Sequence, residues 1–136
     1  MIIPNLMVSD MARSFAFYRG KLGLDLVMAM SPNREVLSQT DGRDAVFAIL
    51  SGQDGQLMLQ TAASLRAELP QLAVKPGFTG AIYIRGLDPR LVVKRVDPGE
   101  IVKPLELQWY GMLEAYVRDP DGYIVCAAIA DGAVVV

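Results

Sequence analysis

The chain has 136 residues, 52% of them hydrophobic and 21% charged, which indicates a folded domain with a substantial core. A net charge of -2 and the lack of any Lys/Arg cluster exclude a basic surface for nucleic acid. The single cysteine excludes an internal disulfide, and the absence of histidine removes histidine-activated nucleophiles and the commonest neutral metal ligand. There is no signal peptide and no apolar run of membrane-spanning length, so we expect a cytoplasmic protein without a membrane partner.

The first half of the chain predicts a strand, a helix and further strands. Residues 2–8 predict the strand, and Asp10 offers the N-cap of the helix. One apolar stripe indicates this helix and consists of Met11, Phe15, Tyr18 and Leu22. More strands are expected over residues 24–30, 35–40, 45–50 and 56–61. Asp41-Gly42 predicts a two-residue hairpin, and a short helix is expected over 64–69.

The second half repeats this order. Residues 81–85 predict a strand, and Asp88-Pro89 begins a helix that ends at Pro98-Gly99. Further strands are expected over residues 100–108, 112–118 and 123–130, the last two joined by a turn at 119–122. We therefore expect one α+β domain, 1–136, of two βαβββ modules at about 1–62 and 78–131. Their curved mixed sheets are expected to leave a ligand cleft. The sequence assigns no role to Val134–Val136.

Two segments near the ends of the chain carry a family resemblance. IPNLMVSDMARSFAFYRGKLGL (Ile3–Leu24) and WYGMLEAYVRDPDGYIVCAAI (Trp109–Ile129) resemble the opening and closing motifs of the vicinal-oxygen-chelate superfamily. That superfamily includes glyoxalase I, extradiol dioxygenases and bleomycin-resistance proteins. The resemblance implies the glyoxalase/bleomycin-resistance fold for nearly the whole chain.

The enzymes of this superfamily chelate a divalent metal with His, Glu or Gln side chains. By resemblance, the four ligand positions fall here on Ile3, on Met58 or Leu59, on Gly80 or Ala81, and on Cys126. Only Cys126 carries a ligating atom, so we expect neither a metal nor another cofactor, and no catalytic residue is assigned.

The chain is most similar to the bleomycin-resistance type, which implies metal-free dimers that sequester a ligand. We therefore expect a metal-independent, homodimeric small-molecule-binding protein that takes an apolar or planar ligand, as in antibiotic resistance. One alternative is a lyase or isomerase of the same superfamily that uses Glu114 or Tyr110 as acid or base. Another is a homodimeric module without a ligand.

Several residues are candidates for binding the ligand. Trp109 and Tyr110 can stack on a planar ligand, and Glu114, two positions from Met112 on one strand, can pair with a ligand amine. Cys126 is expected to be a buried, inert thiol in this site. The full set of candidates is Phe47, Ile49, Gln60, Tyr83, Trp109, Tyr110, Met112, Glu114 and Cys126. Methionines on strands either line an adaptable pocket or fill the core, namely Met7, Met28, Met30, Met58 and Met112.

Overall fold

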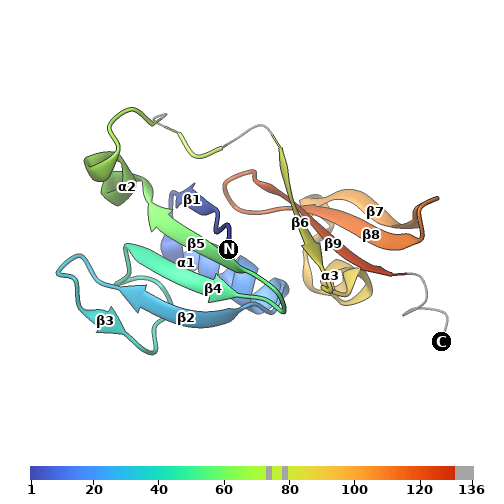
Figure 1. Cartoon of the computed structure of the whole chain (residues 1–136), viewed down its shortest axis with the longest axis horizontal. Helices are drawn as coiled ribbons and strands as arrows, with labels where there is room; N and C mark the ends of the chain where they lie inside the picture. Colours follow the sequence, from blue (N-terminus) through green and yellow to red (C-terminus); the bar gives the residue numbers. More distant parts are fainter. Residues whose placement is uncertain (73–74, 78–79, 131–136) are drawn as a thin grey trace. The chain divides into compact units, whose positions relative to one another are not determined.

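The computed structural model describes residues 1–72, 75–77 and 80–130, so Val134–Val136 lie outside the described residues. The chain divides into two compact units, Met1–Gly77 and Phe78–Val136. Each unit holds one mixed sheet (Figure 1). The mixed α+β architecture expected from the sequence is therefore confirmed.

The first unit contains a five-stranded sheet in the order β1-β5-β4-β2-β3, in which only β1 and β5 are parallel. Its strands are β1 (Asn5–Val8), β2 (Asp25–Met30), β3 (Val36–Leu37), β4 (Phe47–Ser51) and β5 (Gln56–Thr61). Its helices are α1 (Met11–Phe15), the π-helix η1 (Ala16–Lys21) and α2 (Ala62–Glu68). The Asp10 side chain accepts a hydrogen bond from the Arg13 amide and caps α1, and the predicted apolar stripe is buried throughout α1 and η1.

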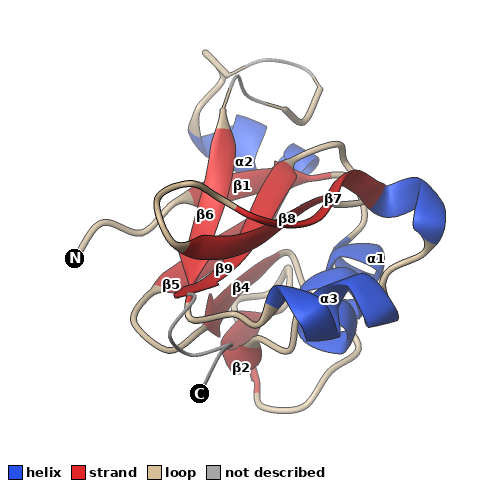
Figure 2. Ribbon diagram, turned by 90° about the vertical axis from the view of Figure 1, so that its right-hand side faces the viewer, coloured by secondary structure: helices blue, strands red, loops and turns tan. Residues whose placement is uncertain are grey.

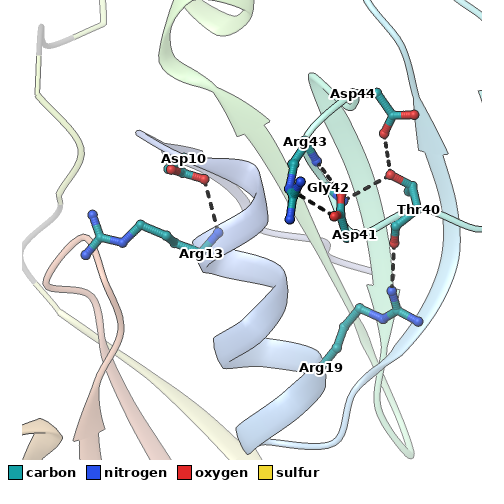
Figure 3. Close-up of polar contacts among 8 residues, drawn as sticks. All are labelled: Asp10, Arg13, Arg19, Thr40, Asp41, Gly42, Arg43 and Asp44. Atoms are coloured by element: carbon teal, nitrogen blue, oxygen red, sulfur yellow. Dashed lines mark hydrogen bonds and ion pairs between the residues drawn. The ribbon is translucent and has the colours of Figure 1, made fainter.

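The hairpin predicted at Asp41-Gly42 is wrong. The short β3 pairs with β2, and β4 pairs with β2 on its other side, so the chain crosses over instead of turning back. Residues 40–44 form a compact loop beside α1 and η1 (Figure 3), where Arg19 Nη1 donates to the Thr40 carbonyl at 3.2 Å. Gly42 has a φ of +98°, and a Cβ there would lie 2.9 Å from the Met11 carbonyl oxygen. The glycine therefore permits close contact with α1 rather than a hairpin turn.

The second unit contains a four-stranded sheet in the order β6-β9-β8-β7. Its strands are β6 (Ala81–Arg85), β7 (Ile101–Leu107), β8 (Met112–Arg118) and β9 (Ile124–Ala130), and its helices are α3 (Pro89–Arg95) and the 3₁₀-helix η2 (Pro98–Glu100). In both units the first strand pairs in parallel with the last, but the first unit has one strand more than the expected βαβββ order, the short β3 at the edge of its sheet. The turn after β8 is held by Asp119, whose Oδ1 accepts from the Asp121 and Tyr123 amides, each at 2.8 Å.

The two faces of the second sheet differ in chemistry. Helix α3 packs against β7, β8 and β9 (Figure 2) and buries Val92 and Val96. Leu113, Ala115 and Val117 of β8 are buried and belong to an entirely apolar face, which suits this packing. The alternate positions of β8 are Met112, Glu114, Tyr116 and Arg118, so the polar and aromatic candidates of β8 lie on the other face of the sheet.

No helix in the described part of the chain is both long enough and apolar enough to cross a membrane.

Candidate functional site

The strand register brings six predicted or neighbouring residues onto one face of the second sheet. Tyr83 of β6 and Tyr116 of β8 both lie opposite Cys126 of β9. Glu114 lies opposite Ala128 in the same β8–β9 pair. Directly paired residues point to the same side of a sheet, and so do residues two apart on one strand. We call this surface the Glu114 face, formed by Tyr83, Met112, Glu114, Tyr116, Cys126 and Ala128.

The centre of this face is a buried carboxylate that accepts two tyrosine hydroxyls. Tyr83 Oη donates to Glu114 Oε2 at 2.5 Å, and Tyr110 Oη donates to the same oxygen at 2.7 Å. Such short distances are typical of hydrogen bonds to an ionised acceptor. The Glu114 residue is only 2% exposed, whereas Tyr83 is 46% and Tyr110 49% exposed. The carboxylate is therefore covered, while the rings that hold it reach the surface.

The hydroxyls that bind Glu114 ionise less readily than ordinary tyrosines. The hydrogen bond to Glu114 is the main cause that raises the pKa of Tyr110 to about 12, with burial and the carboxylate charge adding to it. Burial comes first for Tyr83, followed by the hydrogen bond to Glu114, and together they raise its pKa further. Both groups therefore stay protonated at neutral pH and act as hydrogen-bond donors.

Cys126 is buried beside this pair and packs with Met112, Ala128 and Tyr116. Burial, followed by the negative charge of Glu114, raises the pKa of the thiol to about 11. The thiol is therefore neutral at physiological pH, and its environment is that of an apolar core residue.

A tight turn positions Tyr110 over Glu114. The Gly111 amide donates to the Gln108 carbonyl at 3.0 Å, and Gly111 has a φ of +86°. Trp109 in this turn is 94% exposed, and its ring meets the Tyr110 ring edge to face at 5.3 Å between centroids. The two predicted aromatic residues therefore lie in different environments, because Tyr110 faces Glu114 and Trp109 faces solvent.

Two residues of the site were not predicted from the sequence. Tyr116 is two positions from Glu114, so strict alternation along the strand was a signal for it. Lys103 of β7 lies opposite Tyr116, and its Nζ is 5.4 Å from the centre of the Tyr116 ring. The β7–β8 register shifts on both sides of Lys103, and an irregular register of this kind has no signature in the sequence.

The remaining candidates, Phe47, Ile49 and Gln60, lie in the first unit. Their register places them on one sheet face together with the methionines Met7, Met28, Met30 and Met58. Ala48 and Leu50 alternate with them and are buried. Of the methionines expected to line a pocket or fill the core, these four therefore share one face of β1, β2, β4 and β5, which we call the Met-rich face, whereas Met112 lies in the second unit.

Gln60 is engaged within its own unit. Its Oε1 accepts from Asn5 Nδ2 at 3.0 Å, and its Nε2 donates to Ser64 Oγ at 2.9 Å and to Glu68 Oε1 at 3.0 Å. Both amide hydrogens and the oxygen therefore have partners. These bonds join β5 to β1 and α2.

The comparisons with known proteins agree with this architecture. The family model of the Glyoxalase/Bleomycin resistance protein/Dioxygenase superfamily matches residues 3–127. The chain belongs to this superfamily. The resemblance seen in the sequence is thereby confirmed at the level of the superfamily. No curated protein sequence matches the chain significantly.

Solved structures resemble this superfamily member over nearly its whole length. A protein of unknown function from Agrobacterium tumefaciens has a TM-score of 0.69 at 21% identity, over 96% of this chain and 93% of that one. A glyoxalase-related enzyme from Fulvimarina pelagi has a TM-score of 0.70 at 18% identity, over 95% of this chain and 86% of that one. A glyoxalase/bleomycin resistance protein/dioxygenase from Nocardioides has a TM-score of 0.63 at 22% identity, over 96% and 83%. At these identities the likeness shows the fold alone.

The superfamily implies a divalent metal, but the side chains at the expected positions do not fit one. Ile3, Met58 and Ala81 offer no ligating oxygen or nitrogen, and the Cys126 thiol is buried and protonated. Within residues 1–72, 75–77 and 80–130, no three His, Cys, Asp or Glu side chains gather as a metal site would require.

Proposed function

We propose that this chain is a small-molecule-binding protein of the glyoxalase/bleomycin-resistance type that sequesters an apolar or planar ligand on the Glu114 face. The observation that carries this proposal is the covered Glu114 carboxylate beneath the half-exposed rings of Tyr83 and Tyr110. A few placed polar groups among apolar and aromatic side chains are the usual composition of a ligand site. Met112 and Ala128 supply the apolar floor beside the carboxylate.

The chemistry of the same groups favours binding over turnover. A phenol whose pKa is about 12, as for Tyr110, is a poor proton donor to a substrate at neutral pH. A thiol whose pKa is about 11, as for Cys126, is a poor nucleophile. The alternative lyase or isomerase would leave proton transfer to Glu114, whose Oε2 already accepts two hydrogen bonds.

Fluorescence of the single tryptophan tests the proposal. Trp109 touches the Tyr110 ring, so a planar ligand on the Glu114 face should change its emission in a saturable manner at one ligand per chain. Glu114→Ala and Tyr110→Phe should weaken this binding. Glu35→Gln, at an exposed position of the first unit, is the matched control and should bind as the wild type does. The proposal would be refuted if no compound in a library of planar molecules gave a saturable change in Trp109 emission. It would also be refuted if the ligands bound Glu114→Ala as tightly as the wild type.

We also propose a homodimer, supported by the apolar side chains of β7, which is an edge strand of its sheet. Val102, Leu105 and Leu107 are exposed along this strand. Exposed apolar edges favour pairing with another chain. Sedimentation equilibrium should give twice the chain mass of 14.8 kDa, and Leu107→Glu should lower it to one chain. A monomer in the wild type would contradict this proposal.

A further inference from the structure

We propose that the ligand of the Glu114 face is a small organic monocation with N–H donors on a flat, apolar body, such as an aromatic amidine. This inference rests on the proposed function and adds the charge and shape of the ligand. It begins from Glu114, a covered carboxylate that no ion pair reaches within the described residues. A buried carboxylate is costly unless it is paired with a cation or fully hydrogen-bonded.

The hydrogen bonds of Glu114 leave a place for a ligand donor. Tyr83 and Tyr110 both donate to Oε2, and neither donates to Oε1. A carboxylate has two oxygens and about four acceptor positions, so two neutral hydroxyls on one oxygen satisfy it only in part. A ligand N–H donor at Oε1 would complete the set, and a positive charge on the donor would provide the missing counter-ion.

The aromatic rings around Glu114 favour a cation over a neutral donor. Three tyrosine rings, those of Tyr83, Tyr110 and Tyr116, belong to this site, and a ring face attracts positive charge. The protein itself uses this property, because the Lys103 ammonium lies 5.4 Å from the centre of the Tyr116 ring. Lys103 is exposed and has a flexible side chain, so its ammonium group is not held at Glu114 as a counter-ion.

The surrounding charges limit the ligand to a single positive charge. Arg85 and Arg118 are exposed and lie on the same sheet face as Glu114, by alternation from Tyr83 and Tyr116. Together with Lys103 they outnumber Glu106, the exposed carboxylate opposite Glu114, and so disfavour a second cation at the edge of the site. The half-exposed rings of Tyr83 and Tyr110 offer apolar contact, which suits a flat ring attached to the charged group.

Calorimetric titration with isosteric ligands tests the inference. Benzamidine, benzamide and benzoate share one shape and differ in charge, and the corresponding naphthalene compounds extend the flat surface. Wild-type protein should bind each amidine at least about tenfold more tightly than its amide, as expected for a charge-assisted bond, and the carboxylate most weakly. Glu114→Gln should reduce the preference to about twofold or less.

Glu106→Gln is the matched control for this variant. Glu106 lies opposite Glu114 on β7 but is exposed, so its replacement removes the same unit charge from the neighbouring strand. The preference for the amidine should persist in this control. Tyr110→Phe provides an independent test in case Glu114→Gln does not fold. It keeps the carboxylate and removes one donor, so the amidine should bind with an equal or larger preference over the amide.

The outcomes separate the two proposals. Equal binding of amide and amidine to the wild type would overturn the inferred cation and leave the binding function standing. An amidine preference that survives Glu114→Gln, or that Tyr110→Phe abolishes, would overturn the assignment to Glu114. Failure of all six compounds to bind the wild type at millimolar concentration would count against both proposals.

Discussion

Replacing Glu114 by Gln should make Tyr110 and Tyr83 ionise at a lower pH. The pKa of Tyr110 lies at about 12, against an ordinary value of 10.0. The Glu114 hydrogen bond is the largest cause of this difference, burial is the second and the carboxylate charge is the third. A neutral amide weakens the first cause, because its oxygen can still accept from Tyr110, and removes the third, so the pKa of Tyr110 should move back toward 10.0. Tyr83 should move less, because burial dominates its raised pKa.

Near-ultraviolet absorbance of tyrosinate measures this change directly. The chain has five tyrosines, of which Tyr18 and Tyr123 are buried in the core and Tyr83, Tyr110 and Tyr116 belong to the site. The wild type should show little ionisation of Tyr83 and Tyr110 near pH 10, whereas Glu114→Gln should show at most about half of one additional tyrosinate there, since a group is half ionised at its pKa. Tyr110→Phe in the Glu114→Gln background should remove that signal. Circular dichroism at each pH confirms that the fold persists.

The same groups link stability to pH. Tyr110 binds its proton more tightly when folded, so its stabilising contribution is complete below the unfolded pKa near 10.0 and is lost as the pH rises to about 12. The wild type should therefore lose part of its stability across this interval, and Glu114→Gln should lose less. Superimposable titrations of the wild type and Glu114→Gln would refute the hydrogen-bonded arrangement at Glu114.

Five substitutions test the fold by thermal or urea unfolding. Gly42→Ala should lower the free energy of unfolding by about 3 kcal/mol, because its Cβ would lie 2.9 Å from the Met11 carbonyl oxygen at a φ of +98°. Gly20→Ala is the control and should leave the free energy of unfolding unchanged, because the space around Gly20 is open. Equal stability of the two variants would contradict the packing of the 40–44 loop. Asp119→Ala should cost about 2–4 kcal/mol through its two amide bonds, and Asp119→Asn less than half of that. Ser14→Ala should be neutral or stabilising by about 1 kcal/mol, because the buried Ser14 hydroxyl has no hydrogen-bond partner in the described structure; a clear loss of stability would contradict this.

The elements that the sequence predicts well are those with strong local signals. Strands β5, β6 and β8 match their predicted limits, because each alternating or apolar run is bounded by turn residues. The N-caps at Asp10 and Asp88 are likewise local, since each side chain bonds an amide two or three residues later. The hairpin predicted at Asp41-Gly42 was wrong because strand pairing there depends on residues far apart in the sequence. A turn dipeptide does not reveal which strand lies next to β4, and the close contact of Gly42 with α1 joins distant parts of the sequence.

The site was partly predictable for the same physical reason. Alternation along β8 placed Glu114 and Met112 on one face, and the same rule would have added Tyr116. The sequence could not place Tyr83 opposite Cys126, because the parallel register of β6 and β9 depends on the whole unit. It also could not show that Tyr110 turns back onto Glu114, since that contact needs the backbone of the 108–111 turn.

Methyl NMR of methionine-labelled protein tests most directly the claim that the ligand binds on the Glu114 face. Methionines lie both on that face of the second sheet and on the Met-rich face of the first sheet. The chain has seven methionines, of which Met112 belongs to the Glu114 face. Met28, Met30 and Met58 mark the Met-rich face of the first unit, and Met11 is in its core. Titration with 2-naphthamidine should shift the Met112 signal in a saturable manner and leave that of Met11 unchanged, and Glu114→Gln should need an at least about fivefold higher concentration for the same shift. Saturable binding that leaves Met112 unmoved would contradict the account.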